Sequence, residues 1–193
     1  MKILLASSNN HKIIEMRNIF KGHEIISLRD LNDFDEVEEN GETFKENAFI
    51  KANYFYKKYG YNVLSDDSGL AVDYLNGAPG VYSSRYAGED CNQANNRKKL
   101  LKALAGINNR TAKFVCDLCF IEENGNVNHF TGECLGRILE KETGKTDFGY
   151  DCLFYSNDLN KSFGEASEEE KDAVSHRGRA AIKMLEYLKT KNN

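Results

Sequence analysis

The order of apolar segments predicts an α/β fold in which helices flank a long mixed β-sheet. Short continuous apolar runs such as residues 2–6 are typical of buried strands, and helical periodicity recurs over residues 42–59 and 92–104. Two long β segments, residues 111–122 and 126–140, surround the dipeptide Asn124-Gly125. Because that dipeptide is a strong signal for a hairpin turn, we expect these two segments to pair.

The first elements in chain order are a strand, a polar turn and a helix. Residues 2–6 form the strand, a polar turn begins at Ser7, and the helical pattern that follows is ended by Gly22. The N–H groups at a helix start can bind an anion, and Lys12 in the first turn opposes the helix dipole unless an anion is bound nearby. The alternative is an ordinary capped helix with a solvated lysine.

A second strand over residues 23–28, an acidic loop over residues 30–40 and a long helix come next. Thr43 and Glu46 form a capping-box pattern at the helix start, and Gly60 ends the helix. Most acidic side chains of the loop should be solvated, although one or two could complete a metal site.

Asp66 and Asp67 stand where we expect a short buried strand to end in a sharp turn. Acidic side chains at the end of a buried strand are costly unless a positive charge neutralises them. Carboxylate oxygens suit Mg²⁺, or Mn²⁺ in its place, so a divalent cation is one candidate. A solvated turn, which Asp and Ser also favour, is the alternative.

The C-terminal half supplies a second set of polar and aromatic residues. Residues 77–88 form a structured loop, and residues 148–151 form a compact aromatic-glycine turn before a short strand at 152–155. His176 and Arg177 open the last helix, where they could equally be a plain polar first turn.

Length and charge restrict the function classes. The chain has 193 residues, 40% of them hydrophobic, and a formal net charge of −4. This charge argues against a nucleic-acid-binding module, which needs a basic surface. Without an internal repeat or a linker, residues 1–193 are expected to form a single domain.

Cysteine usage and apolar runs indicate a cytoplasmic protein without a membrane segment. An odd count of five cysteines in a chain of this size argues against a disulfide scaffold. Cys116 and Cys119 lie three positions apart in a predicted strand, so we expect buried free thiols on opposite faces. The apolar run at residues 3–6 is too short for a signal peptide, and no transmembrane run occurs elsewhere.

Four features together suggest a nucleoside triphosphate as ligand. They are the helix start that could bind an anion, the acidic cluster, the aromatic-glycine turn, and the planar donor groups of His176 and Arg177. The chain has neither the Gly-x-x-x-x-Gly-Lys-Ser/Thr motif nor Gly-x-Gly-x-x-Gly, which argues against a P-loop protein and a Rossmann dinucleotide binder.

Over nearly its whole length the chain resembles the inosine/xanthosine triphosphate pyrophosphatase family. The resemblance rests on six motifs in order: Ser7-x-Asn9-x-x-Lys12, Thr43-Phe44-x-Glu46-Asn47-Ala48 with Lys51-Ala52, Ser65-Asp66-Asp67-Ser68-Gly69-Leu70, Gly77-Ala78-Pro79-Gly80, Phe148-Gly149-Tyr150-Asp151 and Ser175-His176-Arg177-Gly178. One departure is Cys152, where the family usually has proline. The resemblance implies an elongated sheet, two lobes around a central cleft, and a homodimer.

The resemblance also implies an activity and a role for each matching residue. The expected activity is Mg²⁺-dependent hydrolysis of the deaminated purine nucleotides ITP, dITP and XTP to the monophosphate and pyrophosphate. Asp67 would be the proton acceptor for water and, with Glu39, a metal ligand. The expected substrate-binding residues are Ser7, Asn9 and Lys12 on the triphosphate, Lys51 and Ser68 nearby, Phe148, Gly149, Tyr150 and Asp151 around the base, Lys171 on the phosphate side, and His176 and Arg177 at the base edge.

Two other functions stay open at this point. A nucleotide-binding sensor would bind the same ligand without needing Asp67 or Glu39. A related pyrophosphatase acting on modified pyrimidine nucleotides is opposed by the motifs at residues 148–151 and 175–178. Tyr82, Arg85 and Tyr86 are candidates for the dimer interface, because aromatic residues and Arg are enriched at interfaces.

Overall fold

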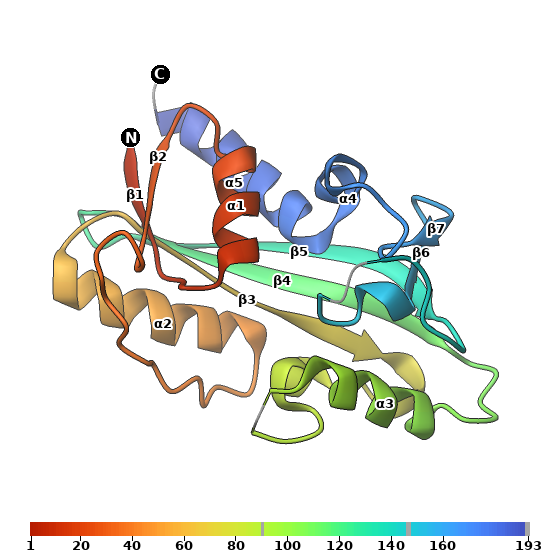
Figure 1. Cartoon of the computed structure of the whole chain (residues 1–193). Coiled ribbons are helices and arrows are strands. Elements are labelled where there is room, and N and C mark those ends of the chain that lie inside the picture. Colours follow the sequence, from red (N-terminus) through yellow and green to blue (C-terminus); the bar gives the residue numbers. More distant parts are fainter. Residues whose placement is uncertain (90, 146–147, 192–193) are drawn as a thin grey trace. The chain divides into compact units, whose positions relative to one another are not determined.

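The computed structural model describes residues 1–89, 91–145 and 148–191 (Figure 1). Within these residues, seven strands form one sheet in the order β2-β1-β3-β4-β5-β6-β7. The strands are β1 (Lys2–Leu5), β2 (Glu24–Ser27), β3 (Val63–Val72), β4 (Thr111–Ile121), β5 (Val127–Ile138), β6 (Phe154–Ser156) and β7 (Lys161–Ser162). Since β1 pairs in parallel with β2 and β3, whereas β6 pairs antiparallel with β5 and β7, the predicted mixed sheet is confirmed.

Helices flank this sheet, as the sequence predicts. The α-helices are α1 (Asn10–Ile19), α2 (Phe44–Tyr59), α3 (Gln93–Ala103), α4 (Glu168–Val174) and α5 (His176–Lys191), and three short 3-10 helices are η1 (Asp73–Leu75), η2 (Gly80–Arg85) and η3 (Asp151–Leu153). The capping box of Thr43 and Glu46 is present at α2, and Gly60 ends that helix with φ +66°. No helix among the described residues is long and apolar enough to cross a membrane.

The chain divides into two compact units, which we describe separately. The first unit comprises Met1–Asp67, Cys116–Gly132 and Arg177–Asn193, and the second comprises Ser68–Val115 and Glu133–His176. The cleft between two lobes that the family resemblance implies stays a prediction.

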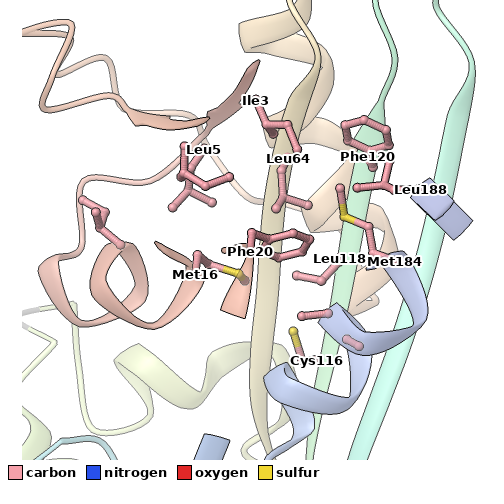
Figure 2. Packing of buried hydrophobic residues seen from close by; sticks show 14 residues of the cluster. Ile3, Leu5, Met16, Phe20, Leu64, Cys116, Leu118, Phe120, Met184 and Leu188 are labelled. Carbon is pink, nitrogen blue, oxygen red and sulfur yellow. The ribbon is translucent and has the colours of Figure 1, made fainter. Parts of the chain in front are cut away.

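The core of the first unit has two clusters. In one cluster, strand residues such as Leu5, Leu64 and Phe120 pack with Met16 of α1 and Met184 of α5 (Figure 2). The other cluster lies on the opposite face of β1, β3 and β4, where it packs against α2. Cys116 belongs to the first cluster and Cys119 to the second, and both are free thiols, so the predicted placement on opposite faces is confirmed.

The second unit has its own core around the far part of β3. Leu70 and Val72 pack with Leu100 of α3 and with an aromatic group from β4, β6 and the position after β7. The members of that aromatic group are Phe114, Phe154 and the residue after β7, Phe163. Tyr150 of the aromatic-glycine turn also belongs to this core.

The sharp turn expected at Asp66 and Asp67 is wrong, because β3 continues without interruption from Val63 to Val72. Leu70 and Val72 extend the buried side of the strand beyond the acidic pair, and their burial favours extended backbone through it. The strand expected at residues 152–155 also begins later, at Phe154, since its first residues belong to η3.

Candidate functional site

The loop before α1 is organised around Asn9, the N-cap of that helix. The side-chain oxygen of Asn9 accepts hydrogen bonds from the backbone N–H groups of His11 and Lys12, at 3.0 and 3.3 Å. The backbone N–H of Asn9 in turn donates to Ser7 Oγ at 3.2 Å. These bonds fix the helix start and occupy the N–H groups of His11 and Lys12, so the positive end of the helix dipole is what favours an anion there.

The side chain of Lys12 reaches a buried network of charges. Lys12 Nζ lies 2.9 Å from Asp66 Oδ2, and Arg177 Nε lies 3.3 Å from the same oxygen. Arg177 Nη1 also donates to Glu15 Oε2 at 2.5 Å. Arg177 itself is only 3% exposed, so three elements of the first unit (α1, β3 and α5) meet at one guanidinium.

Asp66 is the most buried member of this network, with 0% exposure. Burial alone would raise the pKa of its carboxyl, but Lys12, Arg177 and Lys51 outweigh burial and hold that pKa below its ordinary value. Its other oxygen, Oδ1, is buried and accepts no hydrogen bond from the described residues. Asp66 therefore stays ionised and holds Lys12 and Arg177 in place.

A second acidic group comprises Asp67 on β3 and Glu39 in the loop before α2. Lys51 Nζ of α2 lies 2.8 Å from Glu39 Oε1, and Asn47 Nδ2 donates to Asp67 Oδ2 at 3.1 Å. Burial and the negative charge of Glu39 raise the pKa of Asp67 to about 6, although Lys51 and Lys12 act in the opposite direction. Burial and Glu39 thus both disfavour the ionised form of Asp67, which a nearby cation would favour.

Whether a divalent cation fits this pair depends on the donor atoms that the two side chains offer. The described residues contain no group of three or more His, Cys, Asp or Glu side chains arranged for a metal ion. Mg²⁺, however, usually takes one or two carboxylates and completes its shell with water and substrate phosphates. The two carboxylates of Glu39 and Asp67 fit that donor set.

In the second unit, the aromatic-glycine turn is a separate candidate site. Lys171 Nζ of α4 lies 2.5 Å from the buried Asp151 carboxylate and 5.3 Å from the centroid of the Phe148 ring. The His176 ring stacks on Phe114 with centroids 4.8 Å apart and an interplanar angle of 13°. The half-buried Phe148 ring therefore lies beside a paired cation.

The expected site residues divide between the two units. The set in the first unit comprises Ser7, Asn9, Lys12, Glu39, Lys51, Asp67 and Arg177, and the set in the second unit comprises Ser68 on β3, Phe148, Gly149, Tyr150, Asp151, Lys171 and His176. The individual roles expected for them stay predictions.

Sequence reasoning missed several side chains that hold these residues. Glu15 lies three residues after Lys12, a spacing that places both on one face of a helix, and this signal could have identified it. Asn47 stands inside a quoted motif but received no role. Gln93 and Arg97 of α3 bind the turn at Gly149, and no local signal in the sequence indicates that contact.

Comparison with known proteins agrees with the motif-based resemblance. The sequence model of the Ham1 family matches residues 3–187. A dITP/XTP pyrophosphatase of Christiangramia forsetii is 45% identical over 189 residues, covering 97% of this chain and 99% of that protein, and one of Clostridium perfringens is 43% identical with 97% of each covered. The Ham1 protein of Staphylococcus aureus has a TM-score of 0.90 at 38% identity, covering 99% of this chain and 100% of its own. The chain belongs to the Ham1 family.

Proposed function

We propose that this protein is a nucleoside triphosphate pyrophosphatase that hydrolyses deaminated purine nucleotides (ITP, dITP and XTP) and so removes them from the nucleotide pool. The observation that carries the proposal is the half-buried Asp67 carboxylate, which Asn47 holds at 3.1 Å and whose pKa burial and Glu39 raise to about 6. Relatives that carry the name dITP/XTP pyrophosphatase support the substrate class.

Asp67 is suited to accept a proton from an attacking water. Without a bound cation, a carboxyl with a pKa near 6 is mainly ionised at neutral pH, yet it is more basic than an ordinary aspartate. Asn47 holds one of its oxygens, and this hydrogen bond fixes the plane of the carboxylate. In the proposed reaction the water oxygen bonds to the α-phosphorus, Asp67 takes the proton, and the bond from that phosphorus to the bridging oxygen breaks to release pyrophosphate.

Positive groups of the first unit would stabilise the triphosphate and the departing pyrophosphate. Lys12 is held by Asp66, so its ammonium is positioned before substrate binds, and the N–H groups at the start of α1 add a fixed dipole. Glu39 and Asp67 would hold Mg²⁺, or Mn²⁺ in its place. When bound, the cation would neutralise charge on the phosphoryl oxygens, which hydrolysis of a phosphoric anhydride requires. Ser7, Asn9 and Lys51 complete this set.

We propose that the turn at residues 148–151 binds the purine base, with Phe148 stacking on the ring system. Lys171 lies against Phe148 and Asp151, and we propose that its ammonium serves the phosphate side of the substrate from beside this turn. Ser68 contacts the substrate, and His176 and Arg177 supply donors to the base edge. An arginine only donates, so the 6-keto oxygen of inosine fits such a site better than the 6-amino group of adenine.

Three further features belong to the proposal. We include a homodimer in the proposal, with the 58% exposed Tyr82 as a candidate interface residue. We also propose a cytoplasmic location, because the proposed substrates belong to the nucleotide pool. Nucleic acid and membranes are not among the proposed partners.

The test is pyrophosphate release from ITP, dITP, XTP, GTP and ATP with Mg²⁺, comparing the native chain with Asp67→Asn. We expect rapid release from the first three nucleotides and a loss of about 10²- to 10⁴-fold in Asp67→Asn, as is typical for removal of a general base. Asp73→Asn is the matched control, because Asp73 is exposed and outside both candidate sets. Binding without pyrophosphate release in the native chain would instead support a sensor, and activity that survives Asp67→Asn would assign the proton acceptor to another residue.

A further inference from the structure

We propose that Gln93 and Arg97 of α3 are positioning residues that set the affinity for the purine base by fixing the turn at Gly149. This inference rests on the proposed function, because it assigns those two side chains to the turn that binds the base. Neither residue belongs to the motifs that carry the family resemblance.

Both polar backbone groups of Gly149 are held by α3. The backbone N–H of Gly149 donates to Gln93 Oε1 at 2.7 Å, and Arg97 Nη1 donates to the carbonyl oxygen of Gly149 at 3.1 Å. Gln93 and Arg97 are four residues apart on a helix and therefore lie side by side on one face. The two peptide planes that flank the Gly149 Cα atom are thus fixed by one rigid element.

The peptide between Phe148 and Gly149 matters most for the stacking ring. Its carbonyl oxygen accepts a hydrogen bond from the backbone N–H of Asp151 at 3.2 Å, and its N–H is the one that donates to Gln93. Because this peptide plane starts at the Cα atom of Phe148, its rotation would re-aim the ring. Removing the Gln93 acceptor takes away the hydrogen bond on the N–H side of this plane.

Arg97 is itself fixed, which makes the contact precise. It is 5% exposed, and its Nε donates to Glu142 Oε1 at 2.8 Å. The neighbouring Asn96 donates to the carbonyl oxygen of Ser84 at 2.7 Å and accepts from the backbone N–H of Ala87 at 2.6 Å. Together these bonds anchor α3 to η2 and to the loop that follows it.

The turn also bonds to η2 directly. The Tyr150 hydroxyl donates to the carbonyl oxygen of Ser83 at 2.7 Å. Ser83 Oγ in turn accepts from the backbone N–H of Leu70 on β3, at 2.9 Å. The turn is therefore held at consecutive residues, Gly149 by α3 and Tyr150 by η2.

Two observations are compatible with a role of these contacts in ligand binding. Gln93 is exposed, so water could satisfy its amide without the long-range bond to Gly149. Gly149 has φ +55°, and apart from its chain neighbours a Cβ atom built there would meet no heavy atom of the described residues within 4 Å. The turn therefore leaves room at Gly149 beside a backbone that is held at both of its polar groups.

The experiment compares steady-state hydrolysis of ITP by the native chain, Gln93→Ala, Gln93→Glu and the control Lys98→Ala, which changes an exposed residue on the same helix. For Gln93→Ala we expect KM to rise about fivefold, the effect of one hydrogen bond, with kcat within about twofold. The base is the non-reacting end of the substrate, so weaker contact should raise KM without lowering kcat. Gln93→Glu keeps an acceptor oxygen and should restore the native KM.

The KM-against-kcat split separates positioning from folding. A variant that is merely less stable loses active molecules, which lowers kcat and leaves KM unchanged, and that pattern for Gln93→Ala would overturn the inference. The inference would also be overturned if the KM of Gln93→Ala equalled that of Lys98→Ala. The same holds if Gln93→Glu raised KM as much as Gln93→Ala does. In those cases the native chain still hydrolyses ITP and the proposed function stands. If the native chain releases no pyrophosphate from ITP, the proposed function fails, and the inference fails with it.

Discussion

The buried ion pair between Glu15 and Arg177 leads to a quantitative prediction about stability. Arg177 Nη1 lies 2.5 Å from Glu15 Oε2, and the two side chains are 3% and 10% exposed. Replacing Glu15 with alanine removes this partner and leaves the guanidinium buried with Asp66, which it shares with Lys12. A buried charge that loses a partner cannot recover its hydration, so the folded state should be destabilised.

The magnitude follows from how much of the pairing is lost. Removal of one partner from a buried ion pair typically costs about 3–5 kcal/mol. Arg177 keeps Asp66 Oδ2 at 3.3 Å, so we expect the lower end, about 3 kcal/mol, for Glu15→Ala. For a domain with a typical stability of about 5–15 kcal/mol, this is a large fraction of the total. Glu15→Gln should cost less, because its amide oxygen can still accept from Arg177.

The assay is urea unfolding of the native chain, Glu15→Ala and Asn18→Ala. Asn18 lies on the exposed side of the same helix, so its substitution controls for helix propensity and should change stability by no more than about 0.5 kcal/mol. A Glu15→Ala value within that range of the control would refute the reasoning. It would mean that solvent reaches Arg177 in the folded protein and that the ion pair contributes little.

Two further predictions concern titration. In the metal-free protein the Asp67 carboxyl should titrate near pH 6 in carbon NMR spectra. Either Glu39→Gln or added Mg²⁺ should lower that pKa, since the substitution removes a repelling negative charge and the cation supplies an attracting positive one. A pKa that responds to neither change would contradict the assignment of both carboxylates to a cation. The hydrogen bond from Lys58 is the main cause that lowers the pKa of Asp33 from 3.8 to about 2. The contribution of the ionised Asp33 to stability should therefore be complete above about pH 4 and be lost as the pH falls through about 2. The thermal midpoint of Asp33→Asn should therefore lie below that of the native chain at pH 7 and converge with it in acid, whereas the exposed control Glu36→Gln should show no such convergence.

Much of the fold could be predicted because its signals are local. The capping box at Thr43 and the stop at Gly60 depend on residues within one turn of the helix end, and the structure contains both. The opposite faces of Cys116 and Cys119 follow from the two-residue period of a strand. Where the deciding contacts lie within a few residues, the sequence pattern is sufficient.

The acidic pair on β3 shows where local reasoning fails. Adjacent Asp and Ser residues favour a turn, so Asp66 and Asp67 were expected to end the strand. In the structure the buried Asp66 is neutralised by Lys12 and Arg177, which are 54 and 111 residues away in the sequence. Since the compensating charges come from elements distant along the chain, no window around Asp66 contains the information that keeps this strand extended.

The same limit explains why the α3 contacts to the base turn were missed. Gln93 and Arg97 look like ordinary polar residues of a helix, and their partner Gly149 lies 56 and 52 residues further along the chain. A motif identifies side chains that act directly on a ligand, because their type is dictated by the chemistry. A side chain that only holds a backbone group can be any acceptor or donor of suitable reach, so its identity carries little information about its role. In this fold, therefore, the residues that position the turn can be found only from the three-dimensional contacts, and substitutions there should alter affinity while leaving every recognisable motif intact.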